Sequence, residues 1–237
     1  MKKYFKPFIG KPYHFIKRII WSHLRDTAFR EYVASHQDPK IHIGCGCQIR
    51  PNWFNVDFHP FFQGAYYLDV TKPFPFPNAT FARAFSEHMI EHITFGQGLL
   101  FLRELFRVMK PGGRVRIATP NLRTLAELYA EPKNKEQEKY IRTVIDTYNP
   151  SAGAYLEGFV INQLFGFGHR FLYDRQTLGL ILGKAGFVEI EEYTSDRTGD
   201  DAFHGMDAHA NDYIRYETWS WRQTSRLLAN KSRKIRL

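Results

Sequence analysis

The residues with the clearest chemical potential begin at a short glycine turn, Gly44-Cys45-Gly46, directly after a β-prone run. Glycines at the end of a first strand let a ligand approach the backbone, because no Cβ stands in the way. Asp57 and Asp69 end the next two β-prone runs. A carboxylate at a strand tip can accept hydrogen bonds from both ribose hydroxyls, although either acid alone also fits a turn or helix cap. Together the three features predict a nucleoside site, with Asp57 on the ribose and Asp69 on an adenine amino group or a loop that contacts it.

A second group of reactive side chains occupies residues 86–92, SEHMIEH. His88, Glu91 and His92 fit the H-x-x-E-H pattern of inverted zinc peptidases, in which two histidines lie one helical turn apart. Those enzymes need the motif within a long helix and a third ligand far downstream. Here the motif follows a short predicted strand and precedes glycines at 96 and 98. A zinc-dependent hydrolase stays open as an alternative, and the preferred interpretation has no metal site.

The elements that position these residues alternate between strands and helices. The predicted strands are Lys40–Gly44, Trp53–Asp57, Ala65–Asp69, Phe81–Ser86, Arg114–Thr119, Phe187–Tyr193 and Ile214–Arg222. The predicted helical segments are Phe95–Met109 before Pro111-Gly112-Gly113, a polar stretch over 121–148, and Gln176–Lys184. Residues 151–168 are expected to form a loop or lid, and residues 196–212 a polar loop. This alternation predicts an α/β, Rossmann-like, doubly wound, mostly parallel sheet with an antiparallel final strand.

Composition favours one globular domain with appended ends. The chain has 237 residues, 43% hydrophobic, enough for a full-sized core. Its two cysteines, Cys45 and Cys47, are too close for a disulfide framework and too few for a tetrahedral zinc site. Without a secretory signal or a membrane-spanning run, a reducing cytoplasm is the expected location.

The net charge of +9 is concentrated at the two ends. Residues 1–36 hold eight Lys/Arg against two acids, and residues 222–237 hold six Lys/Arg and no acid, so the remainder is slightly acidic. Nucleic acid is therefore not the expected partner. We expect a basic amphipathic helical extension over 1–36, a domain over 37–222 with a helical lid insertion at about 121–170, and a basic tail over 223–237. The extension either packs on the domain or contacts an anionic membrane at its inner face, or a partner.

The chain resembles the class I S-adenosylmethionine-dependent methyltransferases, and within them the methyltransferase type 11-like bacterial proteins found with glycan and cell-envelope genes. The resemblance rests on IHIGCG (41–46), NWFNVD (52–57), LDVTKPFPFPNATFARAFSEHMIEHI (68–93), LFRVMKPGGRVRIATPN (105–121) and GHRFLYDRQTLGLILGKAGF (168–187). It implies S-adenosyl-L-methionine as cofactor, with the methionine moiety at Gly44 and Gly46, ribose at Asp57 and adenine at Asp69. The implied cofactor-binding residues are Gly44, Cys45, Gly46, Asp57, Asp69, Val70, Ser86 and Glu87.

The link from Gly44 to the second strand departs from the usual dinucleotide pattern. Only about nine residues separate them, fewer than a crossover helix requires, and the third glycine of G-x-G-x-x-G is missing. We expect a single helical turn or an extended loop there. Pyrophosphate needs a helix N-terminus, so the short link argues against NAD(P), whereas a sulfonium cofactor carries no phosphate.

Methyl transfer needs an aligned nucleophile and a dry site, and an oxygen nucleophile also benefits from a histidine base. His88, at the cofactor mouth, and His169, after the expected lid, are the catalytic candidates, ahead of His204 and His209. A polar acceptor could contact the segment after His169, whose residues could equally cap the following helix: Arg170, Tyr173 and Asp174.

The acceptor is the least constrained part of the prediction. The sequence holds neither an Asn/Asp/Ser-Pro-Pro-aromatic motif nor a Pro-Cys pair, which argues against nucleobase amino groups and cytosine C5. We expect O-methylation of a sugar, glycan or other small polar acceptor, mainly from the subgroup resemblance. A non-catalytic, cofactor-binding scaffold that docks through the basic ends is the remaining alternative. The sequence does not indicate an oligomeric state.

Overall fold

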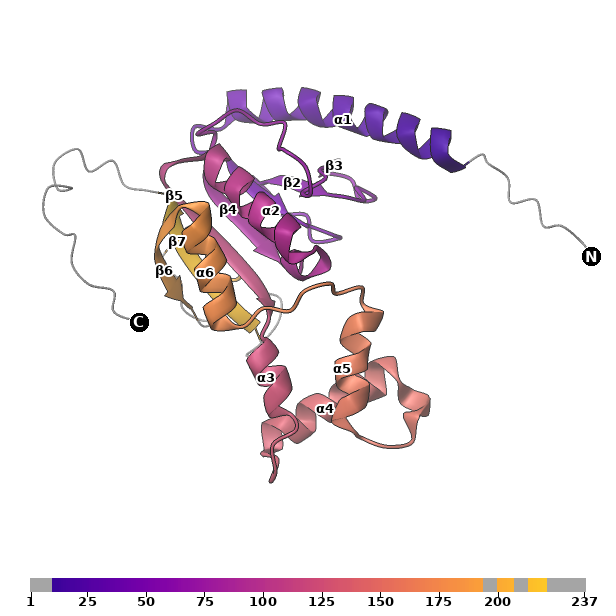
Figure 1. The fold of residues 1–237 in the computed structure, drawn as a ribbon. Coiled ribbons are helices and arrows are strands. Elements are labelled where there is room, and N and C mark those ends of the chain that lie inside the picture. Colours follow the sequence, from indigo (N-terminus) through magenta and orange to yellow (C-terminus); the bar gives the residue numbers. More distant parts are fainter. Residues whose placement is uncertain (1–9, 194–199, 207–212, 221–237) are drawn as a thin grey trace, which may run out of the picture.

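The computed structural model describes residues 10–193, 200–206 and 213–220, which fold around one seven-stranded sheet (Figure 1). The strands are β1 (Lys40–Ile43), β2 (Phe54–Asp57), β3 (Ala65–Tyr67), β4 (Phe81–Glu87), β5 (Met109–Pro120), β6 (Phe187–Glu192) and β7 (Tyr213–Ser220). Their order is β3-β2-β1-β4-β5-β7-β6. β1 to β5 pair in parallel, which confirms the predicted doubly wound sheet, and β7 runs antiparallel to β5 and β6.

Helices cover the sheet and extend beyond it (Figure 1). They are α1 (Gly10–Ser35), α2 (Phe95–Val108), α3 (Leu122–Glu127), α4 (Lys135–Tyr148), α5 (Glu157–Gly166) and α6 (Arg175–Ala185), with 3-10 turns η1 (Ile90–His92), η2 (Pro150–Ala152) and η3 (Asp201–Phe203). α2 and α6 pack side by side, and α1 lies against β3, with its first half extending past the sheet. No helix among the described residues is long and apolar enough to span a bilayer.

The main core lies between the sheet and its covering helices. α2 buries Phe101, Leu102 and Leu105 on one face, as its hydrophobic spacing predicts. A capping box between Thr94 and Gln97 starts this helix. α2 ends at Val108, before the predicted break at Pro111-Gly112-Gly113, because β5 already begins at Met109. Met109 pairs with Phe81 of β4, and the register between the two strands shifts after this pair.

The segment between β5 and α6 forms a second, helical cluster with a hydrophobic core of its own. Residues 151–168, expected to form a loop or lid within the helical insertion, contain α5, so the loop expectation is corrected to a helix. The apolar residues of α5 are the physical reason, since they bury against α4: Val160 and Leu164 pack with Ile141 and Ile145. In Figure 1, α3, α4 and α5 stand apart from the sheet as a lobe.

The first crossover is short, as expected. Within residues 44–53, all of which the structure describes, the chain forms turns and no helix. Backbone hydrogen bonds shape this loop: Gln48 N donates to Cys45 O at 2.8 Å, and Trp53 N donates to Arg50 O at 3.3 Å.

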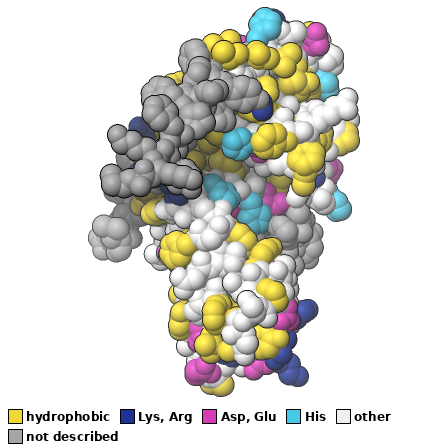
Figure 2. All heavy atoms as spheres, turned by 90° about the vertical axis from the view of Figure 1, so that its right-hand side faces the viewer, with side chains coloured by type: hydrophobic (Ala, Val, Ile, Leu, Met, Phe, Trp, Pro, Cys, Tyr) yellow, Lys and Arg dark blue, Asp and Glu magenta, His cyan; other side chains and the backbone are white. Residues whose placement is uncertain are grey.

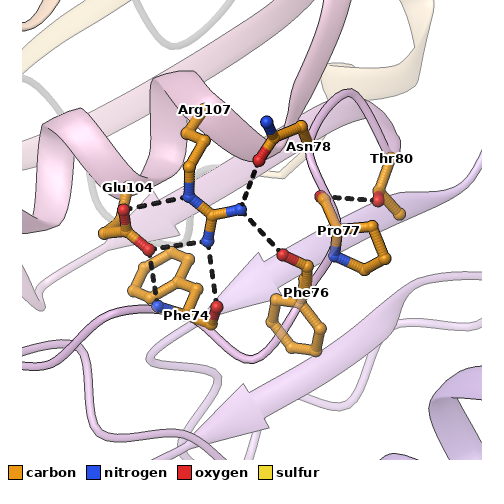
Figure 3. Close-up of polar contacts among 7 residues, drawn as sticks. All are labelled: Phe74, Phe76, Pro77, Asn78, Thr80, Glu104 and Arg107. Atoms are coloured by element: carbon orange, nitrogen blue, oxygen red, sulfur yellow. Dashed lines mark hydrogen bonds and ion pairs between the residues drawn. The ribbon is translucent and has the colours of Figure 1, made fainter.

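Hydrogen bonds from Arg107 of α2 hold the loop between β3 and β4 against this helix (Figure 3). Arg107 donates to the carbonyls of Phe74 and Phe76, both at 2.9 Å, and to Asn78 Oδ1 at 2.8 Å. It also forms a two-point pair with Glu104, whose Oε2 accepts the N–H of Phe74. This arrangement fixes the path of the loop that follows Asp69.

Candidate active site

One cavity of about 880 Å³ opens at the carboxyl ends of β1 to β4. In doubly wound sheets ligands bind at this edge, and the volume suits a molecule of nucleoside size. Of the ten residues predicted to bind cofactor or act in catalysis, eight line the cavity, and Ser86 and His169 do not. The eight are Gly44, Cys45, Gly46, Asp57, Asp69, Val70, Glu87 and His88.

The two glycines of the turn have different physical roles. Gly44 has a φ of 72°, and a Cβ there would lie 2.7 Å from the Cβ of Met89, so only glycine fits. Its N–H donates to Val56 O at 2.9 Å, which ties the turn to β2. Gly46 also has a positive φ, of 50°, but a Cβ there would meet no atom within 4 Å. The space beside Gly46 is therefore open to a ligand.

Asp57 lies at the end of β2 and faces this turn. Its Oδ2 accepts the N–H of Gly46 at 2.9 Å, and its Oδ1 accepts the N–H of His59 at 2.8 Å. An ionised carboxylate can accept about four hydrogen bonds. Asp57 is thus held in place and retains acceptor capacity for hydroxyl groups in the cavity.

Asp69 organises the start of the next loop. Its Oδ1 accepts the N–H and the hydroxyl of Thr71, at 3.1 and 2.6 Å, and its Oδ2 lies 3.3 Å from Lys72 Nζ. Burial raises the pKa of this carboxyl, but the Thr71 and Lys72 contacts outweigh it and lower the pKa below 3.8. This side of the cavity therefore offers a hydrogen-bond acceptor, the ionised Asp69 carboxylate, next to the apolar side chain of Val70.

Cys45 contributes packing rather than nucleophilic chemistry. Its side chain is buried, and burial together with the charge of Asp57 raises the pKa of the thiol to about 12. The thiol is therefore protonated near neutral pH, which makes it a poor nucleophile. Cys47 is exposed on the same turn and also lines the cavity.

Ser86 and Glu87 are adjacent on β4 but differ in their access to the cavity. Ser86 is buried within the sheet and does not line the cavity, so a direct contact of its side chain with cofactor is not supported. The alternation of a strand explains the error, because successive side chains point to opposite faces. Glu87 does line the cavity and is largely buried.

His88 lies at the turn between β4 and η1. It has a φ of 53°, and its Nδ1 lies 3.0 Å from Oε1 of Glu91. Glu91 is fully buried, and its Oε2 accepts the hydroxyl of Thr119 at 2.9 Å. The segment is a single 3-10 turn with His88 outside it, not a long helix, so the alternative zinc-peptidase arrangement of H-x-x-E-H is not formed.

His169 does not line the cavity, and its ring packs against that of His92. The two rings are nearly perpendicular, with centroids 4.8 Å apart. Burial lowers the pKa of His169, with the neighbouring Glu91 charge acting in the opposite direction. The sequence predicts a catalytic role for His169 from its place after the expected lid, but the residue of this segment that lines the cavity is its neighbour Arg170.

The remaining acceptor candidates divide into separate structural roles. Tyr173 is fully buried, and Asp174 caps α6 by accepting the N–H of Thr177 at 2.7 Å. His204 follows η3 and does not line the cavity, while His209 lies outside the described residues. Of the trio after His169, Arg170 alone lines the cavity.

Several lining residues were not predicted from the sequence. His42, Met89 and Gln97 belong to this group. For Gln97 the sequence did hold a signal, because the T-x-x-Q spacing from Thr94 is typical of a capping box at a helix N-terminus. His42 faces the cavity from β1, and burial together with the charge of Arg50 lowers its pKa to about 4. The other lining residues not predicted to bind cofactor are Ile43, Cys47, Gln48, Val56, Phe58, His59, Leu68, Thr71, His92, Ile93 and Arg170.

Comparisons with known proteins give a family match for part of the chain. Residues 59–117 match the family described as methyltransferase domain. No curated protein matches the sequence. This segment runs from the loop after Asp57 through Asp69, His88 and most of β5.

Solved structures with similar folds include three methyltransferases. A SAM-dependent methyltransferase from Archaeoglobus fulgidus has 14% identity and a TM-score of 0.47, covering 85% of this chain and 93% of that one. A SAM-dependent methyltransferase from Thermotoga maritima, described as a possible histamine N-methyltransferase, has 12% identity and a TM-score of 0.45, covering 87% and 95%. Phosphoethanolamine N-methyltransferase 2 from Haemonchus contortus, in complex with S-adenosyl-L-methionine, has 13% identity and a TM-score of 0.42, covering 85% and 53%.

The cavity fits S-adenosyl-L-methionine on its own geometry. Gly46 leaves open space against the backbone, Asp57 keeps acceptor capacity for ribose hydroxyls, and Val70 lies beside the ionised Asp69. The first crossover provides no helix N-terminus for a pyrophosphate. With the strand order and the match of residues 59–117 to the methyltransferase-domain family, these features support S-adenosyl-L-methionine as the cofactor of this cavity.

Proposed function

We propose that the enzyme methylates a hydroxyl oxygen of a small polar acceptor, with a sugar or glycan hydroxyl as the first candidate. The observation that carries this proposal is the His88–Glu91 pair beside the cavity, with Nδ1 and Oε1 3.0 Å apart. A carboxylate that holds an imidazole by one nitrogen orients the ring for proton transfer at the other. Such a base helps a hydroxyl more than a neutral amine, which already carries a free electron pair.

Within this proposal each residue has a defined task. The bound cofactor supplies a methyl carbon activated by positive sulfur. Gly46 and Asp57 hold the cofactor, His88 accepts the hydroxyl proton, and Glu91 orients His88. Arg170 lines the cavity from the end of the helical insertion and binds acceptor oxygens. The insertion, about 121–170, acts as a lid that excludes water.

A methyl-transfer screen tests this proposal. Purified enzyme is incubated with methyl-labelled cofactor and, in parallel, with cell-envelope fractions, free sugars and small amines. The expected product is a methyl ether, and His88→Ala lowers kcat by about 10²- to 10⁴-fold, the usual worth of a general base. Unchanged affinity for S-adenosylhomocysteine, measured by calorimetry, shows that the variant still folds. Methylated amines as the product, or an undiminished kcat in His88→Ala, would overturn the proposal.

A second proposal concerns α1, which we propose rests on an anionic membrane surface at its inner face. The second half of α1 is anchored to the domain, where Arg25 donates to Tyr67 O at 3.2 Å and Phe29 is buried. Earlier along the helix four apolar side chains are more than half exposed, next to the basic Lys17 and Arg18. They are Ile16, Ile19, Ile20 and Leu24. A helix that offers apolar and basic side chains together suits the membrane interface.

Vesicle binding tests the membrane proposal. Wild type should sediment with phosphatidylglycerol vesicles and less with phosphatidylcholine vesicles, and the double variant Ile16→Ser/Ile20→Ser should bind about tenfold more weakly. The matched control is Leu180→Ser, because Leu180 is equally exposed, at 56%, on α6. Equal binding by the double variant and the control would contradict a membrane role for α1.

A further inference from the structure

Three side chains that commonly bind metals meet next to the cofactor cavity. Glu91, His92 and His169 each offer one ligand atom, and these atoms lie within 4.8 Å of one another. Figure 2 shows histidine side chains near the middle of the face that it draws, above the lobe of α4 and α5. We propose that Glu91, His92 and His169 bind a divalent transition-metal ion of the zinc class.

The charge of Glu91 is the first argument. Its side chain has no exposed surface, and its Oε1 lies 3.0 Å from Nδ1 of His88. A buried carboxylate is stable only when a positive charge or several hydrogen bonds compensate for lost water. A divalent ion shared with two imidazoles would supply a positive charge next to the Glu91 carboxylate.

His169 provides an independent second argument. Its Nδ1 is buried and has no hydrogen-bond partner among the residues that the structure describes. A buried ring nitrogen without a partner is unfavourable, and metal coordination is a common way in which proteins satisfy one. The nearly perpendicular His92 ring, 4.8 Å away between centroids, brings a second imidazole to the same place.

The three residues are held by contacts that would also support a metal site. Thr119 donates to Oε2 of Glu91 at 2.9 Å, which fixes the carboxylate in the way outer-shell partners fix metal ligands. The backbone N–H groups of Arg170 and Phe171 donate to the carbonyl of Glu91 at 2.7 and 3.2 Å. These two bonds attach the segment after α5 to η1 and so place His169 beside His92.

The ligand set suits zinc-class ions by type and number. Two imidazoles and one carboxylate form a known catalytic zinc combination, which leaves one or more positions open. Metal–ligand bonds of about 2 Å require ligand atoms within about 4 Å of one another. Side-chain rotations that move the ligand atoms by about 1 Å would therefore bring all three within bonding distance of one ion. The set differs from the sequence motif, since His169, 77 positions beyond His92, takes the place of His88.

The position of the site suggests its role, which rests on the proposed hydroxyl methylation. His92 lines the cavity, so an open coordination position beside it can bind the acceptor hydroxyl. Coordination lowers the pKa of a bound hydroxyl. Its proton passes through His88 to solvent, the oxygen forms the bond to the methyl carbon, and the carbon–sulfur bond breaks to release S-adenosylhomocysteine.

Direct metal binding tests the proposal without relying on activity. Full-length protein is treated with a chelator, dialysed and titrated with Zn²⁺ by calorimetry and with Co²⁺ by visible absorption. We expect one ion per chain and, for Co²⁺, the absorption of a histidine-ligated site. His169→Ala should weaken binding by more than about 100-fold, because one of three ligands is lost. His23→Ala, at an exposed position on α1, should bind like wild type.

Two further measurements separate the possible failures. Equal metal affinity for wild type and His169→Ala, or no binding by either, would overturn the metal site. Retained S-adenosylhomocysteine binding in His169→Ala shows that the variant is folded, since His169 does not line the cavity. If metal binds as expected but the product is not a methyl ether, the proposed function fails and the metal site stands.

Discussion

The backbone N–H of Gly46 donates a hydrogen bond to Oδ2 of Asp57 at 2.9 Å. This bond joins the loop after β1 to the tip of β2, two segments that run side by side in the sheet. Oδ1 of the same carboxylate accepts the N–H of His59, so both oxygens are fixed before any ligand arrives. A carboxylate fixed in this way needs little reorganisation to accept ribose hydroxyls.

Asp57→Asn should therefore weaken binding of S-adenosylhomocysteine by about 10- to 100-fold, because hydrogen bonds to a charged acceptor contribute about 1.5–3 kcal/mol. Isothermal calorimetry measures the change. Asp38→Asn is the matched control, since Asp38 is exposed and outside the cavity. If both variants bind equally well, Asp57 does not hold the cofactor.

The two glycines of the turn should respond differently to alanine. Gly44→Ala places a Cβ 2.7 Å from Met89 Cβ at a φ of 72°, so we expect a loss of about 2 kcal/mol or more in unfolding free energy. Gly46→Ala meets no atom within 4 Å and should cost about 1 kcal/mol for its positive φ alone. Its main effect should be weaker cofactor binding, because the new methyl group enters the open space. Urea unfolding and calorimetry on both variants separate the two effects, and equal stability losses would refute this distinction.

The two cysteines should differ in their rate of alkylation. With a pKa of about 12, Cys45 holds a thiolate fraction of about 10⁻⁴ at pH 8, and this fraction rises about tenfold per pH unit. Because its raised pKa follows from burial, the rate for Cys45 should keep rising well above pH 9. Iodoacetamide labelling of Cys47→Ser, which retains Cys45, should be slow, and labelling of Cys45→Ser should be fast because Cys47 is exposed. Similar rates for the two variants would contradict a buried, protonated Cys45.

The sequence predicted most of the fold because the decisive signals were local. Hydrophobic spacing located α2, and strand tips located Asp57 and Asp69, which line the cavity as expected. Ser86 was predicted to line the cavity but does not, because side chains along a strand alternate between the two faces of the sheet. Residue type alone does not say which face meets the ligand. The glycines of residues 151–168 indicate a loop, whereas the apolar residues of α5 are buried in a cluster with residues of α3 and α4. His169 meets His92 through long-range backbone bonds to Glu91, and spacing along the chain carries no signal for such a contact.

His42 should make stability depend on pH. Burial and the charge of Arg50 lower its pKa from 6.5 to about 4 in the folded chain. The unfolded chain therefore binds a proton near pH 6.5 that the folded chain takes up only near pH 4, and unfolding free energy falls as pH drops between these values. Between pH 7.5 and 5.0 this group should account for about 2 kcal/mol.

His42→Phe should remove the contribution of His42 to the pH dependence of the unfolding free energy, which is the slope to be measured. Phenylalanine keeps a ring beside Phe85, which lies 5.2 Å from the His42 ring, and Asn55 Oδ1 still accepts the N–H of Arg50 at 3.0 Å. Urea unfolding at the two pH values measures the slope. His23→Ala, at an exposed position on α1, is the matched control and should leave the slope unchanged. A slope for His42→Phe equal to that of wild type would show that other groups carry the dependence.

Arg107 should be a specific requirement for the loop that follows Asp69. Its planar guanidinium donates at once to two carbonyls, to Asn78 and to Glu104, a pattern that the single ammonium of lysine cannot reproduce (Figure 3). These bonds also lower the pKa of Glu104 and keep it ionised. We expect Arg107→Lys to lower unfolding free energy by about 2 kcal/mol, measured by urea unfolding, because charged hydrogen bonds are lost from partly buried carbonyls. Arg103→Lys, at an exposed position on the same helix, should change it by less than about 0.5 kcal/mol. Equal effects of the two substitutions would mean that the loop is held by its buried phenylalanines, Phe74 and Phe76, and not by Arg107.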